Sequence, residues 1–224
     1  MAGGLGKRLM PLTKILPKPL IPLGAKSVME MTVEKLKEQE FNQIIIATNY
    51  KSEMFESHFS DGSKWDIKIT YSKEEKRLGT AGPLALISEI REDDFIVING
   101  DILTDLDHRD LLNFHKSNSS DLTVVSKEVT MPLEYGVIEH SNNEINQIRE
   151  KPNIVSEVNA GIYCLNPSVL KLIPNNFFHM TELIQELLLK QFKVMCYKHD
   201  GYWLDIGQMD NYEKAKEDIK EGLI

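Results

Sequence analysis

Two short apolar runs limit the fold of this chain more than any other feature. The segments from Gln43 to Thr48 and from Phe95 to Asn99 are rich in isoleucine and valine, without alternation of polar and apolar residues. Such runs are typical of strands buried on both faces of a parallel sheet. A helical pattern from Val28 to Leu36 precedes the first run, and another from Met54 to Phe59 lies between the two. This order predicts βαβ crossovers, and therefore a doubly wound, Rossmann-like α/β fold with a mixed, mainly parallel sheet.

The chain changes character in its second half. Short alternating segments predict an antiparallel or mixed insertion, followed by two helices and a further strand. The predicted strands of the insertion are Tyr135 to Glu139, Glu144 to Arg149 and Val158 to Leu165. The later elements are a helix from Met180 to Leu188, a strand from Val194 to Tyr197 and a terminal helix from Met209. We expect a single domain over residues 1–224.

Composition excludes several classes of protein. The 224 residues carry a formal charge of −8, which leaves no basic surface for a nucleic acid backbone. Cys164 and Cys196 are too few for a disulfide framework and are expected to be buried strand residues. No apolar run of about 18 residues and no signal peptide pattern occurs. We therefore expect a cytoplasmic protein that binds neither nucleic acid nor membrane.

A glycine-rich loop at the start of the chain suggests a phosphate site. Gly3-Gly4-Leu5-Gly6-Lys7-Arg8 combines three glycines, which let backbone amides approach a polyphosphate, with two cations. A P-loop requires Ser or Thr after its lysine, whereas Lys7 is followed by Arg8. A dinucleotide fingerprint requires a further glycine three residues after Gly6, which is absent. Neither of these two common phosphate loops is present.

The position of the loop is unusual. A phosphate loop in a parallel sheet normally leaves the carboxyl end of a strand, but this loop begins at Ala2. We therefore expect the first strand of the sheet to be missing, or truncated to Met1.

The residues that follow the loop are more specific. Arg8-Leu9-Met10-Pro11-Leu12-Thr13 leads into Leu16-Pro17-Lys18-Pro19-Leu20, where a lysine lies between two prolines. From Ala2 to Leu20 the chain resembles the signature of the sugar-1-phosphate nucleotidylyltransferases, or NDP-sugar pyrophosphorylases. The resemblance implies the nucleotide-diphospho-sugar transferase fold and transfer of a nucleoside monophosphate to a sugar 1-phosphate. It also implies that residues 1–130 bind the nucleotide and residues 131–224 the sugar phosphate.

The same resemblance assigns roles within this first segment. The loop would wrap the triphosphate, while Arg8 and Lys18 would stabilise charge on the transferring and leaving phosphates. The sugar phosphate oxygen is already anionic near neutral pH, so it needs no general base to attack the α-phosphorus. The loop residues predicted to bind nucleotide are Ala2, Gly3, Gly4, Gly6 and Lys7.

Two aspartates are candidate ligands for Mg²⁺. Asp101 directly follows the strand that ends at Ile98, and so lies at the edge of the sheet where α/β proteins bind ligands. The resemblance identifies Asp101 as a metal ligand and catalytic residue, and Asp205 in Trp203-Leu204-Asp205-Ile206-Gly207 as the second ligand. Mg²⁺ needs only one or two protein carboxylates, because water and phosphates supply the rest. Asp107 precedes a helical pattern and is predicted to be its N-cap.

Base and sugar recognition are assigned to other segments. By resemblance, Gly79 and Thr80 approach the nucleotide ahead of a helix predicted from Pro83 to Ile90. Glu74 could accept both donors on the edge of guanine, whereas uracil presents one donor between two acceptors, so Glu74 favours GTP. The sugar-phosphate site is expected from motifs in the insertion, at Tyr135, Gly136, Glu150, Lys151 and Asn159.

Other functions remain open at this point. The enzyme could use UTP or dTTP, or act on an alcohol phosphate that is not a sugar. Some relatives are sensors without activity, but these commonly lose the loop arginine, the lysine or a metal carboxylate, all of which are present here. A homodimer and an upstream regulatory CBS domain pair are further hypotheses. The six histidines are predicted to be structural or exposed, because none is spaced as a metal ligand.

Overall fold

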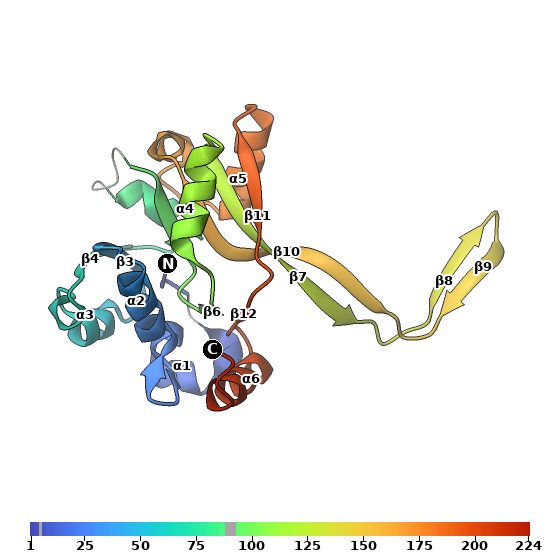
Figure 1. The fold of residues 1–224 in the computed structure, drawn as a ribbon, viewed down its shortest axis with the longest axis horizontal. Helices are drawn as coiled ribbons and strands as arrows, with labels where there is room; N and C mark the ends of the chain where they lie inside the picture. Colours follow the sequence, from blue (N-terminus) through green and yellow to red (C-terminus); the bar gives the residue numbers. More distant parts are fainter. Residues whose placement is uncertain (5, 88–92) are drawn as a thin grey trace.

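The computed structural model describes residues 1–4, 6–87 and 93–224, which form an α/β body with a long projecting arm (Figure 1). Two groups of strands build the sheet of the body. One is a parallel pair and the other a four-stranded sheet in the order β5-β10-β7-β11. The pair consists of β3 (Gln43–Thr48) and β4 (Lys68–Lys73), and the larger sheet of β5 (Phe95–Ile98), β10 (Asn153–Leu165), β7 (Leu122–Pro132) and β11 (Val194–Lys198).

Strand directions confirm the predicted mixed sheet. β10 runs antiparallel to both β5 and β7, while β11 runs parallel to β7. β5, β7 and β11 therefore share one direction, and β10 alone in this group is reversed. The runs predicted as buried parallel strands correspond to β3, which pairs parallel with β4, and to β5, whose partner in the described residues, β10, is antiparallel.

The helices begin where the sequence supplies caps. The side chains of Ser27 and Glu30 form a reciprocal capping box at the start of α2, and Asp107 accepts hydrogen bonds from Arg109 N and Asp110 N as predicted. In place of the helix predicted from Pro83 there is a short 3₁₀ helix, η4 (Gly82–Leu86), and residues 88–90 of that prediction lie outside the described residues. The α-helices are α1 (Leu12–Ile15), α2 (Val28–Glu38), α3 (Ser52–Phe59), α4 (His108–Ser117), α5 (Met180–Leu189) and α6 (Met209–Lys220).

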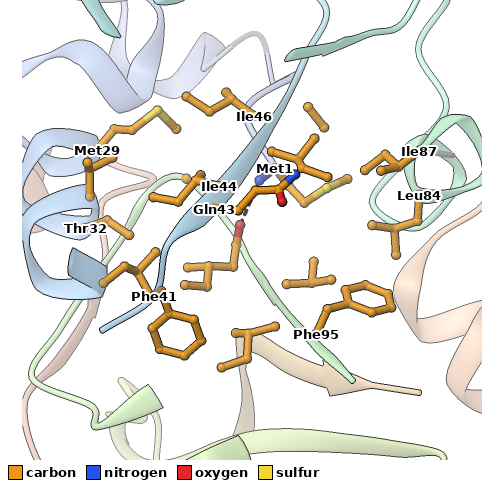
Figure 2. Close-up of a pocket in the computed structure, with 18 of the residues that line it drawn as sticks. Met1, Met29, Thr32, Phe41, Gln43, Ile44, Ile46, Leu84, Ile87 and Phe95 are labelled. Carbon is orange, nitrogen blue, oxygen red and sulfur yellow. Dashed lines mark hydrogen bonds between the residues drawn. The ribbon is translucent and has the colours of Figure 1, made fainter. Parts of the chain in front are cut away.

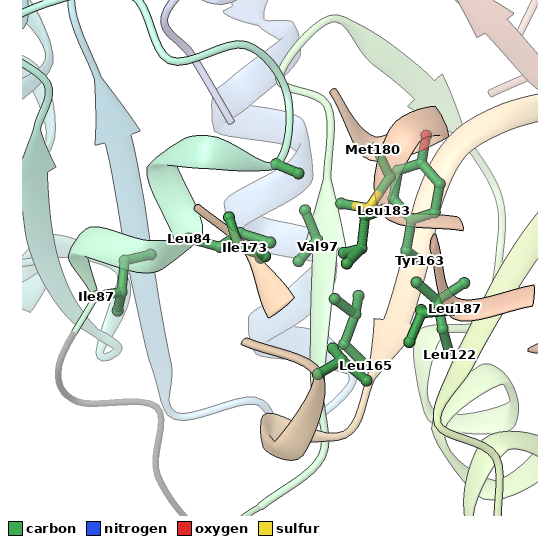
Figure 3. Packing of buried hydrophobic residues seen from close by; sticks show 12 residues of the cluster. Leu84, Ile87, Val97, Leu122, Tyr163, Leu165, Ile173, Met180, Leu183 and Leu187 are labelled. Carbon is green, nitrogen blue, oxygen red and sulfur yellow. The ribbon is translucent and has the colours of Figure 1, made fainter. Parts of the chain in front are cut away.

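Helices cover both faces of the four-stranded sheet. On one face, Val97, Tyr163 and Leu165 pack with α5 and η4 (Figure 3). On the other face, Ile162 and Cys164 pack with α4. Neighbouring residues of β10 thus enter opposite cores, as the pleat of a strand requires. Cys164 is buried as expected, but Cys196 is exposed, because it lies on β11 at the edge of the sheet.

A smaller layer joins the end of the chain to its beginning. β6 (Ile102–Thr104) pairs antiparallel with β12 (Trp203–Asp205), and β1 (Pro22–Leu23) pairs with β2 (Lys26–Ser27). Leu23 and Leu204 pack here with Ala215 of α6. None of the helices in the described ranges combines the length and apolar character needed to cross a membrane.

The arm consists of residues 128–157 and projects from the body (Figure 1). The outer parts of β7 and β10 form its stem, and the hairpin of β8 (Val137–Ser141) and β9 (Glu144–Arg149) forms its tip. The sequence predicted the two strands of the tip, with β8 two residues out of place, but not the stem, since the strand predicted from Val158 begins at Asn153 in the structure. Every residue of β9 is exposed, as is every residue of β8 after Val137.

Candidate active site

Most of the residues predicted to bind nucleotide line one cavity. Its volume is about 210 Å³, and it lies where the glycine loop, the end of β5 and the loop after β4 meet. The predicted residues among its lining are Ala2, Gly3, Gly4, Gly6, Lys18, Glu74, Gly79, Thr80 and Asp101. The structure therefore brings together segments separated by as much as one hundred residues of sequence.

The glycine loop is shaped by contacts with the segment that follows it. Gly6 has φ 59°, in the left-handed region, and a Cβ there would lie 2.6 Å from Thr13 Cγ2 and 3.2 Å from Lys18 Cβ. Thr13 also donates a hydrogen bond from Oγ1 to Gly6 O, at 2.9 Å. A glycine at position 6 thus lets the loop and the Pro17-Lys18-Pro19 segment approach closely.

Lys18 and Asp101 form an ion pair at the cavity. Lys18 begins the short 3₁₀ helix η2 (Lys18–Leu20), in which Pro19 and Leu20 are buried. Asp101 lies just beyond β5, at the edge predicted from the sequence. Since both side chains are largely shielded from solvent, at 13% and 20% exposure, their charges act strongly on a ligand in the cavity.

Strand pairing places Asp205 beside Asp101. Asp205 is opposite Ile102 in the β6–β12 ladder, and Ile206 N donates to Asp101 O at 2.9 Å. Asp205 Oδ1 is buried and has no hydrogen-bond partner among the described residues. Burial raises the pKa of Asp205, and the charge of Asp101 raises it further, against opposing effects of Lys18 and Arg8. Two such carboxylates with a free buried oxygen suit a hard divalent cation, which takes oxygen ligands.

Glu74 lies in the wall of the cavity. Its Oε2 accepts a hydrogen bond from Leu78 N at 2.8 Å, and its Oε1 would lie 2.7 Å from a Cβ at Gly3. Burial raises the pKa of Glu74, although the Leu78 amide acts in the opposite direction. One carboxylate oxygen is thus engaged by the backbone, while the other faces the glycine loop.

The loop at Gly79 and Thr80 is held by the segment before α5. Phe178 N donates to Leu78 O at 2.9 Å, and Thr80 Oγ1 accepts from Met180 N at 2.8 Å. Gly79 has φ 84°, and a Cβ there would collide with Phe178 O. Glycine is therefore required for this close backbone approach.

This pairing brings in residues that the sequence analysis missed. Phe177 and His179 line the cavity. His179 is exposed and is the N-cap of α5, in agreement with the prediction for the histidines, but its place at the cavity was not expected. Arg77 also lines the cavity, although the charged run that contains it gives no such indication. Phe177 and His179 reach the cavity because their segment pairs with the loop at Leu78, about one hundred residues earlier. Nothing in the sequence near either segment indicates that the two meet.

Two predicted cations lie outside the cavity lining. Lys7 and Arg8 are both exposed and belong to the short helix η1 (Lys7–Leu9). Arg8 is near Asp205 instead, since a Cβ at Gly207 would lie 3.4 Å from Arg8 Nη2 and 2.9 Å from Asp205 Oδ1. Arg8 thus lies beside Asp205.

The predicted sugar-phosphate residues divide into two groups. Tyr135, Gly136, Glu150 and Lys151 lie on the arm, where a Cβ at Gly136 would lie 3.1 Å from Glu150 Oε2, and the structure does not bring them to the cavity. Asn159 lies at the base of the arm, and its Oδ1 accepts from Gly161 N at 2.9 Å. Gly161 in turn approaches Asn99 of the cavity lining, since a Cβ at Gly161 would lie 2.6 Å from Asn99 Nδ2.

Comparison with known proteins identifies the family. Residues 1–222 match the family model described as nucleotidyl transferase. The mannose-1-phosphate guanyltransferase of Pichia angusta is 38% identical, and the match covers 95% of this chain. The chain spans 61% of the length of that curated relative.

Two solved structures have the same fold as this chain. A putative glucose-1-phosphate thymidylyltransferase from Bacillus anthracis superposes with a TM-score of 0.79 at 27% identity, covering 96% of this chain and 92% of that one. HddC from Yersinia pseudotuberculosis, solved as a complex with GMP-PN, gives a TM-score of 0.74 at 27% identity, covering 97% and 96%. The chain therefore belongs to the nucleotidyl transferase family.

Proposed function

We propose that this chain transfers a nucleoside monophosphate from a nucleoside triphosphate to a sugar 1-phosphate and releases pyrophosphate. The observation that carries the proposal is the meeting of the glycine loop, Lys18 and Asp101 in one cavity. Backbone amides and a shielded cation there suit the binding of a triphosphate. The acceptor phosphate is anionic near neutral pH, so the protein has only to position it and oppose the charge that develops.

GTP and mannose 1-phosphate are the substrates we favour. Support comes from the curated relatives, which are mannose-1-phosphate guanyltransferases, and from the GMP-PN complex of HddC. Glu74 contributes one free carboxylate oxygen on the cavity wall. Likeness to a putative thymidylyltransferase keeps dTTP and UTP as the alternative.

We also propose that Asp101 and Asp205 hold Mg²⁺. Their adjacent carboxylates and the free buried oxygen of Asp205 fit such an ion. When bound, Mg²⁺ would neutralise charge on the nucleotide phosphates. Lys18, now paired with Asp101, would then contact the phosphates of the substrate.

The sugar phosphate is assigned to residues of the second half of the chain. Glu150 would accept hydrogen bonds from sugar hydroxyls, Lys151 would bind the phosphate, and Asn159 with the Gly136 amide would orient the ring. Tyr135 would line the same site. Because four of these residues lie on the arm, this proposal requires the arm to fold towards a cavity, in the same chain or in a second copy.

The test is pyrophosphate release in the presence of Mg²⁺, with five nucleoside triphosphates screened against mannose, glucose and glucosamine 1-phosphates. We expect the largest signal with GTP and mannose 1-phosphate. Activity with dTTP or UTP would support transferase chemistry and refute the choice of GTP. If nucleotide binds but no pyrophosphate is released with any sugar, the chain is a sensor and the proposed activity is wrong.

A further inference from the structure

The two proposed metal carboxylates are held by different parts of the fold. Asp101 follows β5, and Ile98 at the end of this strand is paired with Ile162 of β10. On the other side of Ile98, the Met1 amine donates to Ile98 O, and Gly100 N donates to Met1 O, each at 2.8 Å. Met1 lies in a largely apolar cavity lined by residues of β3 and β5 (Figure 2). Asp101 is thus positioned from both sides by the main strands of the body.

Asp205 depends on a much shorter ladder. β12 pairs with β6 over three residues, and within the described residues these two strands form a sheet of their own. Asp205 Oδ1 has no hydrogen-bond partner in the described ranges, so this oxygen does not hold the side chain in place. Neighbouring residues of β12 enter opposite cores, since Trp203 packs with the core beneath α4 and Leu204 packs with α6. A shift of the register by one residue would therefore turn Asp205 away from Asp101.

The far end of the ladder, away from Asp205, is built around the side chain of His199. This side chain is only 10% exposed, and its Nε2 lies 2.9 Å from Asp105 Oδ1. The same nitrogen lies 3.2 Å from Thr104 Oγ1 and 3.1 Å from Tyr202 O. Thr104 is the last residue of β6, and Tyr202 directly precedes β12. His199 therefore contacts both strands at the end where the ladder closes.

The partners of His199 require its Nε2 to carry a hydrogen. Thr104 Oγ1 donates its own hydrogen to Tyr202 O at 2.8 Å, and the carboxylate of Asp105 only accepts. The imidazole therefore donates, and its nearest acceptor is the charged oxygen of Asp105, which makes this the strongest of the three contacts. A Cβ at Gly201 would collide with Asp105 and would lie 2.7 Å from His199 Cε1. A glycine at position 201 thus lets the loop before β12 close around this pair.

We propose that His199 is a positioning residue for metal binding. By joining Asp105 to the loop before β12, it fixes the register of the β6–β12 ladder. That register places Asp205 opposite Ile102, and so beside Asp101. His199 acts through the ladder, because its contacts are at the end opposite to Asp205. This inference rests on the proposed function of Asp101 and Asp205 as ligands of Mg²⁺.

The test measures the binding of Mn²⁺ to the full chain by electron paramagnetic resonance, with a GTP analogue that cannot be hydrolysed. Mn²⁺ takes the same oxygen ligands as Mg²⁺, and its free ion gives the signal. His199→Ala should raise the Kd for Mn²⁺ about tenfold, because a group that holds a metal ligand in place is lost. His199→Gln should recover most of the affinity, since its amide can donate to Asp105 from the position of Nε2.

The matched control is His115→Ala. His115 is also a buried histidine, and its Nδ1 lies 2.8 Å from Thr123 Oγ1, away from the β6–β12 ladder. This variant should lose thermal stability but keep the Kd for Mn²⁺. Asp105→Ala removes the partner of His199 instead, and it leaves little empty volume because the Asp105 side chain is 47% exposed. It should weaken Mn²⁺ binding too, and adding His199→Ala to it should cause little further loss.

Hydrogen exchange tests the ladder itself, without metal or nucleotide. Ile206 N donates to Asp101 O, and in His199→Ala this amide should exchange about tenfold faster. The amide of Glu74, which donates to Thr48 O between β3 and β4, should exchange at an unchanged rate. Equal acceleration at both amides would mean a general loss of stability and would overturn the proposal.

Asp205→Ala separates this inference from the proposed metal site. If Asp205→Ala weakens Mn²⁺ binding but His199→Ala does not, the role of His199 is wrong and the metal site stands. If Asp205→Ala leaves the Kd unchanged, the metal site is wrong and the role of His199 fails with it. The proposal is also overturned if His115→Ala weakens Mn²⁺ binding as much as His199→Ala, or if His199→Gln recovers none of the affinity.

Discussion

The predicted site has two parts, one at the nucleotide cavity and one on the arm. The two parts differ in the contacts that hold their residues in position. Around the cavity, segments are bound to one another across long stretches of sequence. Ala2 N donates to Ala47 O, and Phe178 N donates to Leu78 O. On the arm, ion pairs join near neighbours, such as Arg149 to Glu139 and Lys151 to Glu134.

Residues of the cavity are therefore held by the sheet of the body, whereas residues at the tip of the arm are held only by the β8–β9 hairpin. A two-stranded hairpin has little independent stability in water. The arm also exposes large apolar side chains, with Tyr135 at 77% and Ile148 at 64% exposure. Such an arm can change its position relative to the body without breaking the core. We therefore expect the cavity to bind nucleotide as it is, and the arm to move when sugar phosphate binds.

The largest effect is expected within the cavity. Lys18→Ala and Asp101→Ala should each lower kcat by about 10²-fold to 10³-fold, because Lys18 opposes the charge on the transferring phosphates and Asp101 is proposed to hold the Mg²⁺ that does the same. Steady-state pyrophosphate release measures this loss, and circular dichroism shows whether the fold is kept. Lys14→Ala is the matched control, since Lys14 is an exposed lysine of the same segment. Near-normal activity in either variant would refute the assignment of this cavity.

The buried amine of Met1 predicts a pH-dependent stability of the body. Its pKa is 8.0 in the unfolded chain and about 6 in the folded protein, so between these values the unfolded chain holds more protons. Stability should therefore rise between pH 6 and pH 8, by up to about 3 kcal/mol for a two-unit difference. Urea unfolding in EDTA measures this rise.

The matched control for this measurement is the Nα-acetylated protein. It has no amine to titrate, but His108, whose pKa burial lowers to about 4, is the same in both proteins. The difference between the two proteins isolates the contribution of Met1. If both show the same dependence on pH between 6 and 8, the amine is not buried in solution.

The sequence predicted the cavity better than the arm, for physical reasons. Asp101 directly follows a strand, so the edge rule for α/β sheets places it on the ligand side, while Gly6 and Lys18 belong to the signature from Ala2 to Leu20. Phe177 and His179 reach the cavity through backbone pairing with the loop at Gly79, which no local pattern reveals. Alternation predicted the strands at the tip of the arm, but not that they project away from the body, because the pattern of a strand does not state which part of the molecule its faces contact.

Removing one cation of the arm should test whether the arm reaches the cavity. Lys151→Ala is expected to raise KM for the sugar 1-phosphate about tenfold, the loss of one charge-assisted contact, with KM for the nucleotide unchanged. Lys190→Ala is the control, because Lys190 forms an exposed pair with Glu186 on α5, outside the cavity and the arm. An unchanged KM for the sugar phosphate in Lys151→Ala would mean that the arm does not complete the site.

An effect of similar size is expected for recognition of the base. Glu74→Gln should lower the preference for GTP over dTTP about tenfold in kcat/KM, because the amide replaces one carboxylate acceptor by an NH2 donor. Glu75→Gln, an exposed neighbour, should leave the preference unchanged. Oε2 of Glu74 is engaged by Leu78 N, so a single free oxygen has to meet the guanine edge. If the preference survives in Glu74→Gln, the base is read by other groups of the cavity, such as Arg77 or the backbone near Gly79.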